Sequence, residues 1–195
     1  MVSFSYQHTH YYLLPTADGK SLLAFDAGYP CSLHEYARSI KSTGYRFEQI
    51  RWVMVSHFHL DHAGLIRDFQ DAGIQCLLFQ NQGGGIDDME RIIKRSYPKY
   101  EPILKDGFLP LKTGDSRAFL SSIGLSGEVV QTLGHSDDSV SLITDAHEVL
   151  IGDLYPISQI MDDDVKSQKS WARIREMGGR FIYPSHAEPF ELGEG

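Results

Sequence analysis

The stretch Ser56-His57-Phe58-His59-Leu60-Asp61-His62 places three imidazoles and one carboxylate within six consecutive residues, directly after the apolar run Trp52 to Val55. Histidine and aspartate are costly to bury unless each has a partner, so packing alone gives no reason for this composition. In an extended segment His57 and His59 share one side, and the acid and the last histidine follow where the chain turns. Neutral imidazole and carboxylate are ligands for zinc, iron or manganese. The stretch therefore predicts a metal site.

The rest of the composition is that of an ordinary globular protein. With 195 residues, of which 42% are hydrophobic and 23% charged, the chain is expected to form a single domain over residues 1–195. A formal charge of −8 argues against broad nucleic-acid binding. No apolar run is long enough for a membrane helix. Two isolated cysteines and a start unlike a signal peptide favour a cytoplasmic location.

The spacing of apolar residues predicts strands and helices packed on a sheet, an α/β (α+β) protein. Strands are expected at His10 to Leu14, Ser21 to Phe25, Arg51 to Ser56, Ile74 to Phe79, Val129 to Leu133, Val140 to Thr144, Glu148 to Ile151 and Phe181 to Tyr183. Helices are expected from a Ser32/Glu35 capping box to Gly44, around Leu65 to Phe69, around Met89 to Ile93, and after the acidic cap Asp162-Asp163-Asp164.

The segment from Asn81 to Lys112 interrupts this succession of strands and helices. It opens with Gly83-Gly84-Gly85, which matches no phosphate-binding loop and is interpreted as a flexible break between secondary-structure elements. The segment ends among several prolines and is a candidate lid or pocket wall.

Three further histidines and acids occupy the same kind of position as the first cluster. His135, Asp153 and His186 each follow an expected strand and lie in a loop that contains glycine, serine or proline. Groups at equivalent strand ends can converge at one edge of a sheet, where functional loops concentrate. We therefore expect these three side chains near the His57 cluster.

These motifs, together with Asp26-x-Gly28 near the start, resemble the metallo-β-lactamase-fold superfamily over essentially the whole chain. The resemblance implies a four-layer αββα sandwich. It also implies that His57, His59 and His135 hold one metal ion, that Asp61, His62 and His186 hold a second, and that Asp153 bridges both. Two loops depart from the usual pattern: Leu133 and Asp138 stand where many relatives have Pro and Gly, and Pro184-Ser185-His186-Ala187 replaces P-G-H-G.

The resemblance predicts a dinuclear-metal hydrolase that cleaves a small ester, lactone or thioester by attack of a metal-bridging hydroxide. Two divalent ions are expected, zinc first, with iron or manganese as alternatives. Asp61 is expected to orient the hydroxide or to carry its proton to the leaving group. Tyr155 is a candidate oxyanion donor, with a buried structural tyrosine as the equal alternative. The expected partner is a small-molecule substrate, and the oligomeric state is left open.

The narrower resemblance is to glyoxalase II and lactonases, because Asp153 stands where many true β-lactamases have cysteine. The absence of a helical C-terminal domain argues against a glutathione thioester as the substrate. Two other reactions on the same fold stay open: cleavage of a small phosphodiester, and oxidation of a persulfide by O₂ at a single iron. Metal buffering or sensing without catalysis is the non-enzymatic alternative.

Overall fold

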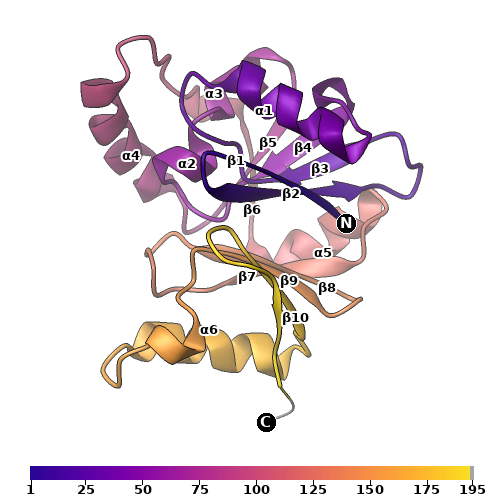
Figure 1. Cartoon of the computed structure of the whole chain (residues 1–195), viewed down its shortest axis with the longest axis vertical. Coiled ribbons are helices and arrows are strands. Elements are labelled where there is room, and N and C mark those ends of the chain that lie inside the picture. The colour runs from indigo at the N-terminus through magenta and orange to yellow at the C-terminus, as the bar shows by residue number, and fades with distance from the viewer. Residues whose placement is uncertain (194–195) are drawn as a thin grey trace.

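The chain forms two β-sheets that lie face to face between layers of helices, in a computed structural model that describes residues 1–193 (Figure 1). The helices are α1 (Leu33–Ile40), α2 (Leu60–Ala63), α3 (Ile66–Asp71), α4 (Gly83–Ser96), α5 (Ser116–Ser122) and α6 (Val165–Glu176). The strands are β1 (Val2–Tyr6), β2 (Thr9–Pro15), β3 (Leu22–Phe25), β4 (Ile50–Met54), β5 (Gln75–Phe79), β6 (Phe108–Leu111), β7 (Gly127–Gln131), β8 (Val140–Thr144), β9 (Glu148–Gly152), β10 (Phe181–Pro184) and β11 (Phe190–Glu191). Within residues 1–193 no helix is long and apolar enough to span a membrane.

The direction of the strands brings several strand ends to one edge of each sheet. The first sheet has the order β1-β2-β3-β4-β5-β6, and β3 to β6 run parallel. The second has the order β11-β10-β9-β8-β7. In it β9 pairs parallel with β10 and antiparallel with β8, which pairs antiparallel with β7. Hence β7, β9 and β10 point the same way and end on a common side.

Alternate residues of the inner strands enter different cores, as the period of two in a strand requires. In β2, Leu13 packs beneath α1 and α3, whereas Leu14 packs between the two sheets. In β9, Leu150 faces the other sheet and Val149 packs with Trp171 of α6. Three buried layers therefore separate four layers of structure, which confirms the predicted αββα sandwich.

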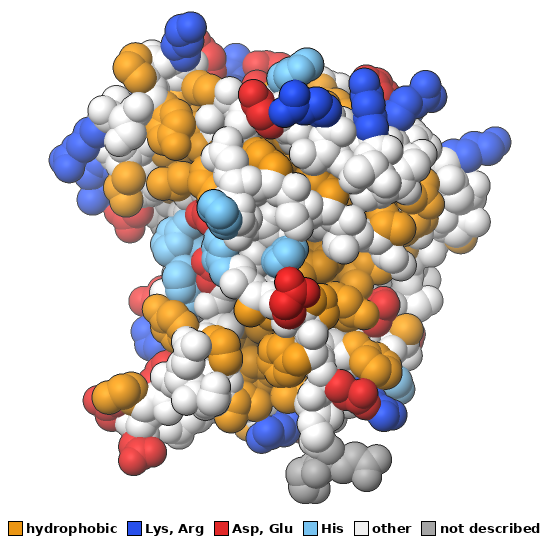
Figure 2. Space-filling model, viewed as in Figure 1, with side chains coloured by type: hydrophobic (Ala, Val, Ile, Leu, Met, Phe, Trp, Pro, Cys, Tyr) orange, Lys and Arg blue, Asp and Glu red, His pale blue; other side chains and the backbone are white. Residues whose placement is uncertain are grey.

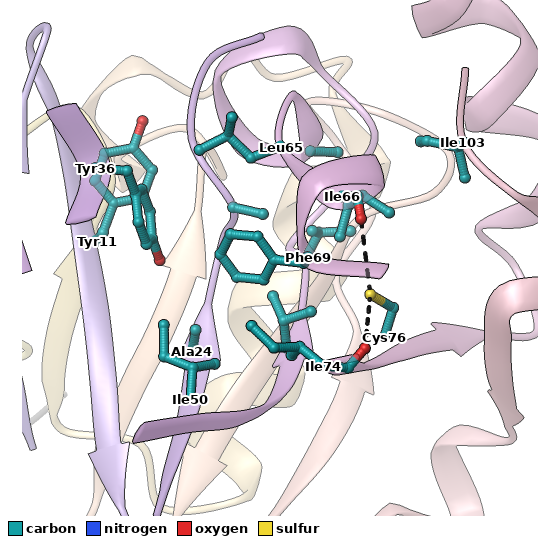
Figure 3. Packing of buried hydrophobic residues seen from close by; sticks show 14 of the residues in the cluster. Tyr11, Ala24, Tyr36, Ile50, Leu65, Ile66, Phe69, Ile74, Cys76 and Ile103 are labelled. Carbon is teal, nitrogen blue, oxygen red and sulfur yellow. Dashed lines mark hydrogen bonds between the residues drawn. The ribbon is translucent and has the colours of Figure 1, made fainter. Parts of the chain in front are cut away.

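The core beneath α1 and α3 holds the segment that follows the histidine cluster (Figure 3). Phe69 of α3 meets Tyr36 of α1 edge to face, with ring centroids 5.5 Å apart. The buried thiol of Cys76 lies 3.6 Å from the carbonyl oxygen of Ile74 and 4.0 Å from that of Ile66. Because α2 and α3 follow each other closely, this packing also fixes the position of α2.

Two local expectations from the sequence are wrong. Gly83 to Gly85 are not a flexible break between elements but form the first turn of α4. Gly85 has no room for a side chain, because a Cβ there would lie 2.4 Å from Asp138 Oδ2. Ser32 does not cap α1 through its side chain, since its hydroxyl donates to the carbonyl oxygen of Tyr29 at 2.6 Å. The acidic cap is confirmed: the Asp164 side chain accepts from the Ser167 amide.

Five elements have no counterpart among the sequence-based expectations: β1, β6, β11, α2 and α5. Pro110 lies within β6, and proline is tolerated there because β6 is the edge strand of its sheet. β1 is the opposite edge strand of the same sheet, and β11 has only two residues. Short or edge strands carry weak apolar patterns because they need less burial on both faces.

Candidate metal centre

All seven residues that the sequence singles out as ligands follow strands that end on the same side of the sandwich. They are His57, His59, Asp61 and His62 after β4, His135 after β7, Asp153 after β9 and His186 after β10. Histidine side chains gather in a hollow between the two halves of the molecule, at the left of Figure 2. Gly152 makes this convergence possible: its φ is +57°, and a Cβ there would lie 2.5 Å from the Ser56 Cβ.

The seven side chains form two groups that share one member. The first group is His57, His59, His135 and Asp153, and the second is Asp61, His62, Asp153 and His186. Within each group, one nitrogen or oxygen atom from every residue lies within 4.8 Å of the others. Each group could hold a metal ion, and the shared Asp153 places the two possible sites side by side.

Asp153 lies between the two groups with one oxygen toward each. Its Oδ1 is 3.2 Å from His62 Nε2 and 3.4 Å from His186 Nε2. Its Oδ2 is 3.5 Å from His135 Nε2 and 3.9 Å from His57 Nε2. A carboxylate in this position can place one oxygen on each of two cations.

Several buried polar atoms at the centre lack the partner that burial requires. His57 Nε2, His62 Nε2 and Asp153 Oδ1 are inaccessible to solvent and have no hydrogen-bond partner within residues 1–193. The other ring nitrogens are occupied, since His57 Nδ1 lies 2.9 Å from Ser56 Oγ and His62 Nδ1 donates to Asp26 Oδ2 at 2.8 Å. Metal-binding histidines are typically held in this way through the second nitrogen. The donor set therefore fits divalent metal ions.

The order and spacing of these residues also match a known family. A family model described as the metallo-beta-lactamase superfamily matches residues 8–186. The chain belongs to this superfamily. The match begins at the first sheet and ends at His186, so it includes every residue of the two groups. The broad resemblance read from the sequence is thereby confirmed, and the narrower one to glyoxalase II and lactonases stays a prediction.

Several solved structures share the fold at low sequence identity. The family protein TTHA1429 from Thermus thermophilus is 19% identical, with a TM-score of 0.71 over 97% of this chain and 73% of its own. TTHA1623, solved in a di-iron-bound form, is 18% identical, with a TM-score of 0.71 over 97% of this chain and 93% of its own. The metallo-beta-lactamase MIM-1 from Novosphingobium pentaromativorans is 21% identical, with a TM-score of 0.64 over 91% and 70%.

Asp26 also belongs to this centre, although the Asp26-x-Gly28 motif by itself assigned it no role at the metal site. It follows β3 at a φ of +72° and is completely buried. Its Oδ1 accepts from the Ser56 amide at 2.6 Å, and its Oδ2 accepts from His62 Nδ1 at 2.8 Å. Asp26 therefore fixes the orientation of His62. The available signal was its position, because it follows an apolar strand just as His57 does.

Replacing Asp26 with alanine is expected to lower the free energy of unfolding of the metal-free protein by about 2–4 kcal/mol, since buried donors of Ser56, His62 and Ser185 lose their acceptor. It is also expected to weaken metal binding by roughly 10–100-fold, because His62 loses the group that orients it. Urea denaturation and metal titration measure the two effects. Asp71→Ala, which breaks an exposed ion pair with Arg67, is the control and should cost less than about 1 kcal/mol. Unchanged metal affinity in Asp26→Ala would contradict the role.

The charges of the centre divide its histidines into two kinds when no metal is bound. Burial lowers the pKa of His57 well below its usual range and also lowers that of His135, so both imidazoles are neutral and can donate to a metal. Contacts with Asp153 and Asp61 raise the pKa of His186 to about 10. Burial alone raises the pKa of Asp61, but the neighbouring imidazoles of His186 and His62 outweigh it and hold that pKa below its usual range.

These shifts predict how the stability of the metal-free protein depends on pH. His186 contributes stability that is fully present below its ordinary pKa of 6.5 and is lost as the pH rises through about 10. Asp61 contributes stability that is present above its ordinary pKa of 3.8 and is lost as the pH falls. In chelator-treated protein, the melting temperature should therefore decline between pH 6.5 and 10.

Thermal melts of His186→Ala should show a smaller decline over the same pH range than the parent chain. His34→Ala, which removes an exposed histidine on α1, is the matched control and should leave the decline unchanged. Identical pH profiles for His186→Ala and the parent would show that His186 does not carry this charge coupling.

Tyr155 lies beside the first group and is not a buried structural residue. Its side chain is 43% exposed, and its ring meets that of His135 at a centroid distance of 5.5 Å and an angle of 73°. With His135, Asp153 and His186 it lines a cavity of about 330 Å³. The alternative of a buried structural tyrosine is therefore wrong, and a role toward substrate stays a prediction.

Proposed function

We propose that this chain is a hydrolase that uses two divalent metal ions to cleave a small carbonyl substrate, an ester, lactone or thioester. The observation that carries the proposal is the set of buried, unpartnered atoms of His57, His62 and Asp153, which face one another across the two groups. Membership of a superfamily composed mostly of metal-dependent hydrolases supports the same reaction class.

In this proposal each group of four side chains holds one ion, and Asp153 contacts both. His57, His59 and His135 complete the first site, and Asp61, His62 and His186 complete the second. The support is geometric. The two groups together contain five imidazoles and two carboxylates, and within each group the ligand atoms lie within 4.8 Å of one another. Imidazole and carboxylate together suit zinc, iron and manganese.

Bound divalent metal ions supply hydroxide near neutral pH, because they lower the pKa of water from 15.7 to roughly 7. The protein's own contribution is to orient the reactants. Asp61 belongs both to the second group and to the lining of a large neighbouring cavity, so its carboxylate can pass a proton to a leaving group held there. Tyr155 lines the smaller cavity beside the first group, and we propose that its hydroxyl donates a hydrogen bond to the substrate carbonyl oxygen.

We propose zinc as the metal, with iron as the alternative. A structural neighbour, TTHA1623, was solved in a di-iron-bound form, which supports iron on this fold. Metal analysis of the chain purified without added metal separates the two. Manganese fits the same donor types.

The experiment that tests the function is hydrolysis of a panel of neutral esters, lactones, thioesters, β-lactams and phosphodiesters by the metal-loaded chain. Cleavage of a carbonyl substrate that stops on chelation and returns with metal is the expected result. Cleavage of phosphodiesters alone would replace the proposal with a phosphodiesterase. A single bound iron with oxygen consumption and no hydrolysis would replace it with an oxygenase.

A further inference from the structure

A cavity of about 630 Å³ lies beside the second group, between the His57 loop and α4. It reaches from His59 and Asp61 at the centre to Asn81 and Ile92 at α4. A substrate whose carbonyl lies at the metal centre would place the rest of its structure in this space. The residues of the cavity wall therefore bear on which substrates the chain accepts.

Asn81 stands at a special position in the first sheet. It follows β5, just as His57 follows β4 and Asp26 follows β3, and these three strands are parallel neighbours. The C-terminal ends of such strands form the edge where ligands bind in α/β proteins. Asn81 thus lies at the same edge of the sheet as the metal centre, and it lines the large cavity.

Asn81 is partly exposed, but the two polar atoms of its amide are buried without a partner. Both Nδ2 and Oδ1 are inaccessible to solvent, and neither has a hydrogen-bond partner in the part of the chain that the structure describes. Exchanging the two atoms by a flip of the amide would not help, since both are unpaired. A buried amide in this state is unfavourable unless a ligand or water completes its hydrogen bonds.

The neighbouring residue Gln82 has an amide with a structural role, because both of its polar atoms form hydrogen bonds within the protein. Gln82 is completely buried, its Nε2 donates to the Val55 carbonyl oxygen at 2.9 Å, and its Oε1 accepts from the Phe79 amide at 3.1 Å. Gln82 therefore ties the start of α4 to the strand that leads into the histidine cluster. Asn81 forms no such bond within residues 1–193, so its side chain can turn toward a molecule in the cavity without losing a hydrogen bond.

The remaining wall of the cavity is apolar on one side. Phe58, Leu60 and Met89 line it, and Ile92 of α4 lines it with 56% of its surface exposed. An exposed isoleucine on a helix gains by burial against an apolar group, at roughly 25 cal/mol per Å² of apolar surface removed from water. This wall suits a hydrocarbon chain.

The charged residues of the cavity are acidic. Its lining carries four carboxylates, those of Asp61, Asp88, Asp137 and Asp138. Within residues 1–193 no lysine or arginine lines it. Arg91 pairs with Asp88, and Lys166 pairs with Asp137 at 2.5 Å, but neither cation belongs to the lining. Asp61 belongs to the second metal group, and Asp138 accepts from the Phe58 amide. On the α4 side of the cavity, away from the metal centre, a negatively charged group would meet acidic side chains and no cationic side chain of the lining.

We propose that this cavity binds the uncharged, apolar acyl part of the substrate and that the Asn81 amide forms hydrogen bonds with a carbonyl or amide group in that part. The proposal rests on the hydrolase function proposed above and names its substrate class: neutral acyl compounds rather than anionic ones. Asn81 is a specificity-determining residue in this account. The apolar wall receives the chain, and the acidic lining rejects a terminal carboxylate.

The binding test uses two amides that the enzyme is not expected to cleave, octanamide and the monoamide of octanedioic acid. They share chain length and differ in one terminal carboxylate. NMR spectra of the ¹⁵N-labelled, metal-loaded chain should show octanamide shifting the side-chain amide signals of Asn81, which are assigned by their loss in Asn81→Ala. Octanamide should bind about tenfold more weakly to Asn81→Ala, as expected for loss of one hydrogen bond to a buried group.

The matched control is Gln80→Ala, which removes an exposed amide one residue away and should leave octanamide binding unchanged. The charged amide should bind at least about tenfold more weakly than octanamide to the parent chain, because its terminal carboxylate meets an acidic lining that carries no lysine or arginine side chain. Equal binding of the two amides, equal binding by Asn81→Ala and the parent, or no shift at Asn81 would each overturn the proposal.

A kinetic arm separates this inference from the hydrolase proposal. With the p-nitrophenyl ester of N-hexanoylglycine, whose amide carbonyl can reach Asn81 while its ester carbonyl lies at the metal centre, Asn81→Ala should raise KM about tenfold and leave kcat nearly unchanged, the pattern of lost substrate binding. Octanamide binding at Asn81 without hydrolysis of any ester would overturn the hydrolase and leave the cavity assignment standing. Ester hydrolysis with an unchanged KM in Asn81→Ala would overturn the cavity assignment and leave the hydrolase standing.

Discussion

Replacing Asp153 with alanine is expected to remove metal from both sites and to abolish hydrolysis. Asp153 is the one residue common to the two groups, with Oδ1 3.2 Å from His62 Nε2 and Oδ2 3.5 Å from His135 Nε2. Loss of a group that merely orients a ligand weakens metal binding by roughly 10–100-fold. Loss of a ligand to two ions should exceed this at both sites, so the metal content should fall from two ions per chain to less than one.

Metal content is measured on protein purified in parallel and equilibrated with the same free metal concentration. Asp163→Ala, which removes an exposed acid outside both groups, is the control and should keep two ions and full activity. Circular dichroism of Asp153→Ala checks that the chain is folded. A folded Asp153→Ala chain that keeps two ions would contradict the bridging role.

Replacing Asp61 with alanine is expected to lower kcat by about 10²–10⁴-fold, the range for loss of a positioned proton-transfer group. Asp61 Oδ2 lies 3.0 Å from His186 Nε2 and 3.3 Å from His62 Nε2, so it also belongs to the second metal group. The first group does not contain Asp61 and should keep its ion. The expected metal content is therefore one ion per chain, in contrast to the Asp153 variant.

Kinetics at saturating metal separate the two roles of Asp61. If excess metal refills the second site in Asp61→Ala and kcat stays low, the carboxylate acts on protons as well as on metal. Near-normal turnover of Asp61→Ala at any metal concentration would contradict both roles. The Asp61→Asn variant, which keeps the shape and removes the charge, should resemble Asp61→Ala.

The clustering of the seven candidate ligands could be predicted from the sequence, because histidine and aspartate have few other uses at strand ends. Histidine is costly to bury unless it has a partner, and His57, His135 and His186 all lie in the two groups that could hold a metal ion. The layered fold could be predicted as well, because the inner strands carry long apolar runs with a period of two. Both inferences use information that is local in the sequence.

Asp26 and Asn81 could not be singled out in the same way, because a lone acid or amide after a strand also begins many ordinary turns. Their roles depend on contacts between distant parts of the chain. Asp26 is identified by its hydrogen bond to His62, 36 residues away, and Asn81 by the absence of any partner within residues 1–193. Gly85 is similar, since its need for glycine comes from Asp138 in a distant loop.

The departure at Asp138 also has a structural reason that only the fold reveals. Asp138 Oδ2 accepts from the Phe58 amide at 2.6 Å, so this carboxylate holds the backbone between His57 and His59. A glycine at this position, as in many relatives of the resembled family, could not form that bond. Gly85 then provides the space that the larger residue needs.

The central claim is that two metal ions share Asp153. A crystal structure of the metal-loaded chain, with anomalous diffraction recorded on both sides of the metal absorption edge, tests it most directly. The account predicts two anomalous peaks roughly 3.5–4 Å apart, the usual spacing of two-metal sites, with one Asp153 oxygen on each. A single peak in the first group, or two peaks without contact to Asp153, would contradict it.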